Sequence, residues 1–190
     1  SAWSSGQQIR VVPKTFEAQW VGAITKKAAK LPEGRFVNTQ YKRTDYKALW
    51  AEVDTLSQKS IIVSKDVSVG GKKIVNAVVY VSGMGHYELS LNGKKVGDDE
   101  FAPLWSEYSK TIYYNVYDVT AMLQKLKGSI AIEALLGNGF FNVQGRERYT
   151  KLQTTFGPPQ LWLQMEINYA DGSRQTVKTD GSWQWRLSPV

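Results

Sequence analysis

Two turn signals, Asn92-Gly93 and Asp171-Gly172, each follow a stretch in which apolar and polar residues alternate. The alternating stretches are residues 86–91 before the first signal and residues 161–169 before the second. Asn-Gly and Asp-Gly readily adopt the positive φ angles that tight hairpin turns require. Alternation with a period of two is typical of strands that bury one face. The sequence therefore predicts antiparallel hairpins at these positions.

From residue 59 to the end of the chain, short stretches typical of strands recur, some alternating and others, such as residues 74–81, almost continuously apolar. The expected strands are residues 60–69, 74–81, 86–91, 111–119, 130–136, 161–169, 175–178 and 182–187. Seven or eight short strands at this spacing indicate an all-β fold, an antiparallel sandwich or barrel. Helical spacing of apolar residues predicts one short helix within residues 45–56, and Thr120 is expected to cap a helical turn at residues 121–126.

The first 58 residues differ from the rest because Pro and Gly interrupt them at Pro13, Gly22, Pro32 and Gly34. We therefore expect residues 1–58 to be an N-terminal extension that packs on, or leads into, the sandwich. Residues 59–190 are expected to form the β-sandwich module itself.

Composition excludes several classes of site. The chain has no Cys and a single histidine, His86, so neither a thiolate nucleophile nor a multi-His metal site is available. The net charge of +7 would suit an anionic partner, but the basic residues are scattered and nucleic-acid motifs are missing. No apolar run approaches the ~18 residues of a membrane span. We expect neither a nucleic-acid nor a membrane partner.

Oxygen-bearing and aromatic side chains are the remaining candidates for binding. Asp98 and Asp99 stand beside Glu100, and oxygen-rich loops of this kind can bind calcium, although the spacing is not that of an EF-hand. A solvated acidic turn is the alternative interpretation. The chain also has 7 Trp, 10 Tyr and 6 Phe, residues that fill sandwich cores and also stack on sugar rings.

Several blocks of sequence, in order along the chain, resemble the N-terminal domain of bacterial α-L-rhamnosidases. The strand–hairpin–strand block at residues 79–98 is similar to that family's signature, and Phe101-Ala102-Pro103-Leu104-Trp105-Ser106-Glu107-Tyr108 resembles its Leu-Ala-Pro-Gly-Trp-Thr-Asp-Tyr loop. Further similar blocks are residues 18–23, 117–120, 135–142, 156–159 and 180–189. Leu104 departs from the family, in which many members have Gly.

The resemblance implies a galactose-binding-like jelly roll at the start of an inverting enzyme of glycoside hydrolase family 78. In that family the catalytic acid and base lie in a downstream (α/α)6 barrel, so no catalytic residue is expected in this chain. The implied partners are rhamnose-containing glycans and the downstream catalytic domain of the same chain. No cofactor is expected to be required. We expect the parent enzyme to act outside the cytoplasm, in the periplasm or after secretion.

The resemblance is densest in two blocks that follow strands, and loops on a rigid sandwich are where binding groups collect. We therefore expect a sugar site at the loop of residues 98–108 and the loop around Asn138. Trp105 and Tyr108 would supply a stacking face. Asp98, Asp99 and Asn138 would bind sugar hydroxyls, or Asp98 and Asp99 would bind calcium.

Two alternatives stay open at this point. Trp105 and Tyr108 could instead be buried and anchor their loop to the sandwich. The whole module could likewise be structural, supporting the catalytic barrel without a ligand of its own.

Overall fold

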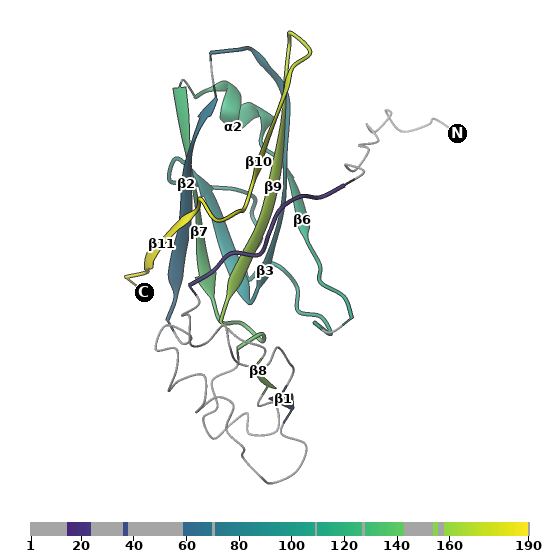
Figure 1. Cartoon of the computed structure of the whole chain (residues 1–190), viewed down its shortest axis with the longest axis vertical. Helices are drawn as coiled ribbons and strands as arrows, with labels where there is room; N and C mark the ends of the chain where they lie inside the picture. The colour runs from purple at the N-terminus through teal and green to yellow at the C-terminus, as the bar shows by residue number, and fades with distance from the viewer. Residues whose placement is uncertain are drawn as a thin grey trace, which may run out of the picture.

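The chain forms two antiparallel sheets that face each other across one apolar core (Figure 1). The computed structural model describes residues 15–23, 36–37, 59–69, 71–108, 110–126, 128–142, 154–155 and 158–189. Its elements are β1 (Phe36–Val37), β2 (Ile61–Val69), β3 (Ile74–Met84), β4 (His86–Leu91), β5 (Lys94–Lys95), β6 (Asn115–Asp118), α2 (Thr120–Gln124), β7 (Gly128–Gly137), β8 (Thr154–Thr155), β9 (Gln160–Tyr169), β10 (Arg174–Lys178) and β11 (Gln184–Leu187).

The strands are not arranged in chain order. One sheet has four strands in the order β10-β9-β3-β6, and the facing sheet has five in the order β11-β2-β7-β4-β5. Strands β1 and β8 form a separate short pair. The predicted fold class, an all-β antiparallel sandwich of the jelly-roll type with little helix, is confirmed.

The core lies between β7 of one sheet and β9 of the other. Ile132 and Leu136 of β7 and Leu163 and Met165 of β9 are all fully buried. Burial alternates along β7, although the sequence shows a short apolar stretch there. Each such side chain contributes about 1.5–3 kcal/mol when it leaves water, so these four residues form a substantial part of the stabilising core.

Both turn signals lie at hairpin tips, as predicted. Asn92 and Gly93 join β4 to β5 with φ angles of 48° and 73°, and the Asn92 side chain accepts a hydrogen bond from the Ala131 amide at 2.6 Å. The second tip is longer than the expected two residues. The Gly172 amide donates to the Tyr169 carbonyl, and the Tyr169 amide donates to the Ser173 carbonyl.

The helical turn forms where it is predicted, but Thr120 does not cap it. Thr120 is the first residue of α2, the N-cap position is Val119, and the Asp118 carboxylate accepts the hydrogen bond of the Thr120 amide at 2.9 Å. The Thr120 hydroxyl instead accepts a hydrogen bond from the Ala77 amide at 2.9 Å, because α2 packs beside β3. The helix expected within residues 45–56 lies outside the described residues. The described ranges contain no helix with the length and hydropathy of a membrane span.

Strand β6 is shorter than the predicted strand of residues 111–119. It forms one edge of the four-stranded sheet, and residues 111–114 bond elsewhere. The Thr111 carbonyl accepts a hydrogen bond from the Ser106 hydroxyl at 2.5 Å, and the Tyr113 carbonyl accepts one from the Ser82 hydroxyl at 2.7 Å. The connection between β5 and β6 is therefore a long loop.

Part of the expected N-terminal extension packs on the four-stranded sheet. Val21 and Leu161 exchange two backbone hydrogen bonds of 2.9 and 2.8 Å. Residues near Val21 therefore pair with β9 beyond the point where the pairing of β10 with β9 ends, at Lys178. The Phe16 ring lies 5.0 Å from the Trp162 ring, on the outer face of the same sheet. The boundary at residues 58–59 stays a prediction.

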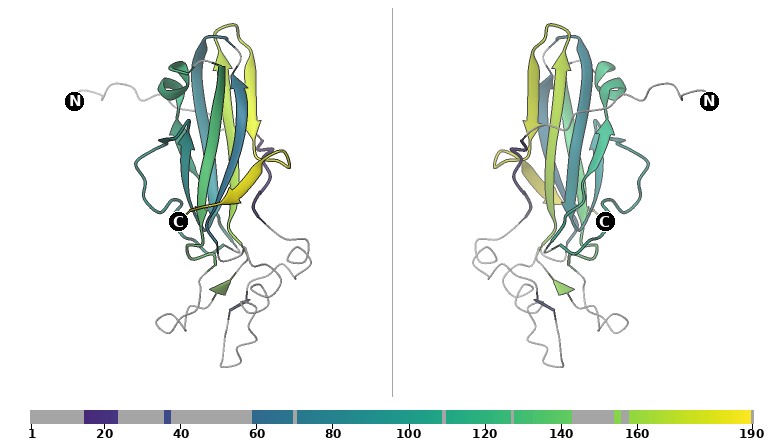
Figure 2. Two further views of the ribbon diagram at one scale, coloured as in Figure 1. Left: turned by 90° about the vertical axis from the view of Figure 1, so that its left-hand side faces the viewer. Right: turned by 90° about the vertical axis from the view of Figure 1, so that its right-hand side faces the viewer.

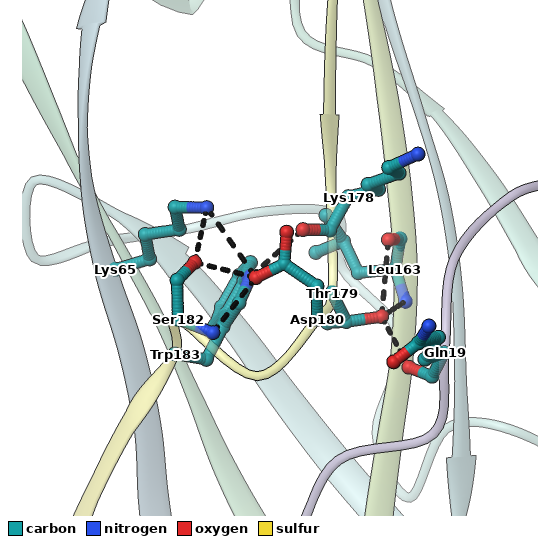
Figure 3. A network of polar contacts seen from close by, with 8 residues as sticks. All are labelled: Gln19, Lys65, Leu163, Lys178, Thr179, Asp180, Ser182 and Trp183. Carbon is teal, nitrogen blue, oxygen red and sulfur yellow. Dashed lines mark hydrogen bonds and ion pairs between the residues drawn. The ribbon is translucent and has the colours of Figure 1, made fainter.

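Thr179 joins this N-terminal segment to the crossing between the two sheets (Figure 3). Its hydroxyl accepts a hydrogen bond from the Leu163 amide at 3.1 Å and donates one to the Gln19 carbonyl at 2.6 Å. Thr179 is fully buried. Within the connection from β10 to β11, the Trp183 indole N–H donates a hydrogen bond to the Lys178 carbonyl at 2.8 Å.

Replacing Thr179 by valine should lower the free energy of unfolding by about 1–3 kcal/mol, because the buried Leu163 amide then loses its acceptor and the Gln19 carbonyl loses its donor. Urea unfolding followed by circular dichroism measures this loss. Thr176→Val is the matched control: the Thr176 hydroxyl bonds Glu166 at the exposed surface, and its loss should cost less than about 0.5 kcal/mol. Equal losses in the two variants would contradict the role assigned to Thr179.

Candidate functional site

The two loops in which the site is predicted meet at one end of the sandwich. The loop after β5 runs beside the sandwich (Figure 2), and the turn of residues 138–142 follows β7. The Trp105 ring of the first loop lies 6.0 Å from the Phe140 ring of the second, with the two planes tilted by 48°. The predicted convergence of these loops is thus present in the structure.

The loop after β5 is held by buried residues that alternate with exposed ones. Ala102 and Pro103 are buried, and the Ala102 carbonyl accepts a hydrogen bond from the Tyr87 amide at 2.7 Å. On either side of them, Phe101 and Leu104 are 76% and 79% exposed. The backbone is therefore fixed to β4 while the side chains of Phe101 and Leu104 extend into solvent.

Trp105 and Tyr108 have different environments, although the sequence suggests one role for both. Trp105 is 63% exposed and is available for stacking. Tyr108 is half-buried, and its ring packs edge-on against buried Phe141 at 5.2 Å. Burial raises the pKa of the Tyr108 hydroxyl. Trp105 matches the predicted platform, whereas Tyr108 matches the alternative role of a loop anchor.

The acidic residues of the first loop point to separate partners. Asp98 and Asp99 are exposed, and the Tyr117 hydroxyl donates a hydrogen bond of 2.7 Å to Asp99. The pKa of Tyr117 is raised to about 12, mainly by burial; the hydrogen bond to Tyr87 opposes this rise, whereas the hydrogen bond and negative charge of Asp99 contribute to it. Glu100 pairs with Lys95 at 2.9 Å.

These acids do not form a ready cage for a cation. Within the described part of the chain, no three His, Asp or Glu side chains are grouped so that they could hold a metal ion. Calcium at Asp98 and Asp99 stays a prediction, and it would need ligands beyond these two carboxylates.

Asn138 is largely engaged within its own turn. Its side-chain oxygen accepts a hydrogen bond of 3.0 Å from the Asn142 amide group, and its carbonyl accepts the Asn142 backbone N–H at 3.1 Å. Asn142 is 4% exposed, so this pair closes the turn over the end of the core. The first contribution of Asn138 to the site is therefore to hold Phe140 in place.

Three residues near the site were not predicted from the sequence: Phe140, Phe101 and His86. Phe140 is 48% exposed while its neighbour Phe141 is buried, and no sequence pattern tells which of the two rings faces out. His86 contacts the Phe101 ring at 5.7 Å. A Cβ on Gly139 would lie 2.8 Å from His86 Cδ2, so Gly139 lets the turn close over the imidazole.

Comparison with known proteins shows the family of this domain. Residues 72–190 match the family described as the α-L-rhamnosidase N-terminal domain. The chain belongs to this family. Curated α-L-rhamnosidases similar to it are those of Formosa agariphila, 35% identical over 122 residues, and of Streptomyces avermitilis, 29% identical over 147 residues. The matches cover 63% and 74% of this chain, but 13% of each relative.

Solved structures of α-L-rhamnosidases resemble the same region. The Streptomyces avermitilis enzyme, complexed with L-rhamnose, gives a TM-score of 0.60 at 28% identity over 70% of this chain and 13% of that one. The Aspergillus terreus enzyme gives 0.57 at 30% identity over 69% of this chain and 15% of that one. This rhamnosidase N-terminal domain thus corresponds to a small part of each enzyme.

The different environments of Trp105 and Tyr108 predict different effects on the stability of the domain. Tyr108→Ala should lower the free energy of unfolding by about 2 kcal/mol, because it removes the ring that packs on Phe141. Trp105→Ala should change it by less than about 0.5 kcal/mol, since its ring is mainly in solvent. Urea unfolding of both variants makes the comparison. A large loss for Trp105→Ala would show that this ring is an anchor as well.

Proposed function

We propose that this rhamnosidase N-terminal domain recognises carbohydrate and does not cleave it. The observation that carries the proposal is the exposed pair of Trp105 and Phe140, which two loops bring to 6.0 Å at one end of the sandwich. Ring faces that remain in solvent on a rigid scaffold can stack on the apolar C–H face of a pyranose. Packing within this domain leaves about half or more of each side chain in contact with solvent.

Polar groups on the same loop would supply orientation. Asp98 and Asp99 are exposed carboxylates, which accept hydrogen bonds from sugar hydroxyls. The Tyr117 hydroxyl already orients Asp99. A few such groups beside an apolar surface are the usual composition of a small-molecule site. The supported ligand class is a neutral sugar, and L-rhamnose is the first candidate because the relatives are α-L-rhamnosidases.

We further propose that the parent protein hydrolyses terminal α-L-rhamnosyl residues of glycans or glycosides, outside the cytoplasm. The domain spans about 13% of the α-L-rhamnosidases named above, so the catalytic groups would lie in the remainder of the parent. The role of this domain would be to hold the glycan, or the enzyme on the glycan, while that remainder acts.

A second function has its own supporting observation. Phe101 and Leu104 are more exposed than Trp105 and carry no polar group, and a patch of this kind is also typical of a surface covered by protein. The domain would then support the catalytic domain without binding sugar. Titration with sugar distinguishes the two functions.

Isothermal titration of the domain with L-rhamnose, with and without calcium, tests sugar binding. We expect Trp105→Ala and Phe140→Ala each to weaken binding about tenfold, or about 1.4 kcal/mol, through loss of the stacking face. Trp185→Ala is the matched control, because Trp185 is 47% exposed on a different strand, and it should leave the affinity unchanged. No heat of binding in the unaltered domain would favour the supporting role, and an affinity unchanged in Asp99→Ala/Asn138→Ala would contradict a contribution of these two residues to the site.

The isolated domain should release no nitrophenol from an aryl α-L-rhamnoside, even at high protein concentration. Glycoside hydrolysis needs two carboxyl groups facing each other across the scissile bond. Asp99 and Glu100 of the Trp105 loop instead contact Tyr117 and Lys95. Turnover that disappears in Asp99→Asn would overturn the non-catalytic assignment.

A further inference from the structure

Trp185 and Leu187 lie on the core-facing side of β11, yet they are 47% and 52% exposed. Cross-strand partners place them there: Trp185 pairs with Val63 and Leu187 with Ile61. Directly paired residues project from the same face of a sheet. Val63 and Ile61 are both 2% exposed and belong to the core. The same face is thus buried on β2 and open on β11.

The exposure follows from the unequal width of the two sheets. The sheet of β11 has five strands and the facing sheet has four, and β11 is its outermost strand beside β2 (Figure 1). Among the described strands, β11 pairs with β2 alone, so its other edge has no strand partner within the described part of the chain. Its charged residue, Arg186, points to the opposite face and pairs with Glu133 at 2.9 Å.

An open edge strand with an apolar face invites a partner unless charge or a covering segment protects it. Charge does not protect the inner face of β11. The covering segment should therefore come from outside the described structure.

We propose that the inner face of β11, formed by Trp185 and Leu187, is the docking surface for the polypeptide that follows Val190 in the parent protein. The relatives are several times longer than this chain, which spans 13–16% of them. The Ser188 amide donates to the Ser60 carbonyl at 2.9 Å, so the chain leaves β11 directly beside this surface. Following residues reach the two side chains without a long connection.

This surface is distinct from the aromatic pair of Trp105 and Phe140. The loop of Trp105 follows β5, at the opposite edge of the five-stranded sheet from β11. The inference rests on the proposed parent being longer than this chain, but not on sugar binding. Sugar binding and docking can therefore fail independently.

Hydroxyl-radical footprinting of the full-length parent, read out by mass spectrometry, tests the docking. We expect Trp185 to be oxidised at least fivefold more slowly than Trp105, although their exposures in this domain are similar, at 47% and 63%. In the chain that ends at Val190, the two residues should be oxidised at rates within twofold of each other. Equal rates for Trp185 and Trp105 in the full-length parent would overturn the proposal.

A double variant, Trp185→Ser/Leu187→Ser, shows what covers the surface. In the full-length parent it should speed amide hydrogen exchange in the residues that follow Val190, while Val75→Ser, at a residue 56% exposed on β3, should not. Unchanged exchange in the double variant would contradict docking.

Sedimentation of the chain ending at Val190 should show a monomer. A dimer lost in the double variant would identify a second copy as the partner and reject the proposal.

Discussion

The apolar core between the two sheets, with β7 and β9 at interior positions, is the interaction on which the arrangement of the domain depends. Four core side chains have no surface exposed to solvent: Ile132 and Leu136 on β7, and Leu163 and Met165 on β9. Because these strands are central in their sheets, the edges fall to β5, β6, β10 and β11. Loops and side chains that are not needed for packing gather at those edges and at the ends of the strands. Both candidate binding surfaces are of this kind.

Sequence patterns predicted the strands best where one face is buried and a turn follows. Residues 86–91 form β4 with the predicted bounds, because strict alternation ends at Asn92-Gly93. The pattern failed where hydrogen bonds from distant residues compete with local preference. Residues 111–114 do not belong to β6, because carbonyl groups in this segment accept hydrogen bonds from the hydroxyls of Ser106 and Ser82. The Thr120 hydroxyl likewise bonds Ala77 and does not cap its own helix. Such contacts join residues far apart in the chain and have no periodic signature.

The candidate site shows the same division between what a sequence reveals and what it does not. The meeting of the two loops and the exposure of Trp105 agree with the sequence-based expectation. Tyr108 is an anchor, because its ring has Phe141 to pack against. Asn138 closes its own turn, which a lone polar residue in a loop does not reveal. Phe140 was missed because the adjacent rings of Phe140 and Phe141 are chemically identical, and only the three-dimensional structure assigns one to the core and the other to solvent.

The pairing of β2 with β7 and β11 has a consequence for where this domain begins. The matched family region starts at residue 72, after β2. Strand β2 supplies nine residue pairs to β7 and all four partners of β11. A fragment cut at residue 72 would leave β7 with a bare edge and β11 detached. Folding of the complete five-stranded sheet therefore needs residues upstream of the matched region, and the segment near Val21 adds a further pairing to β9.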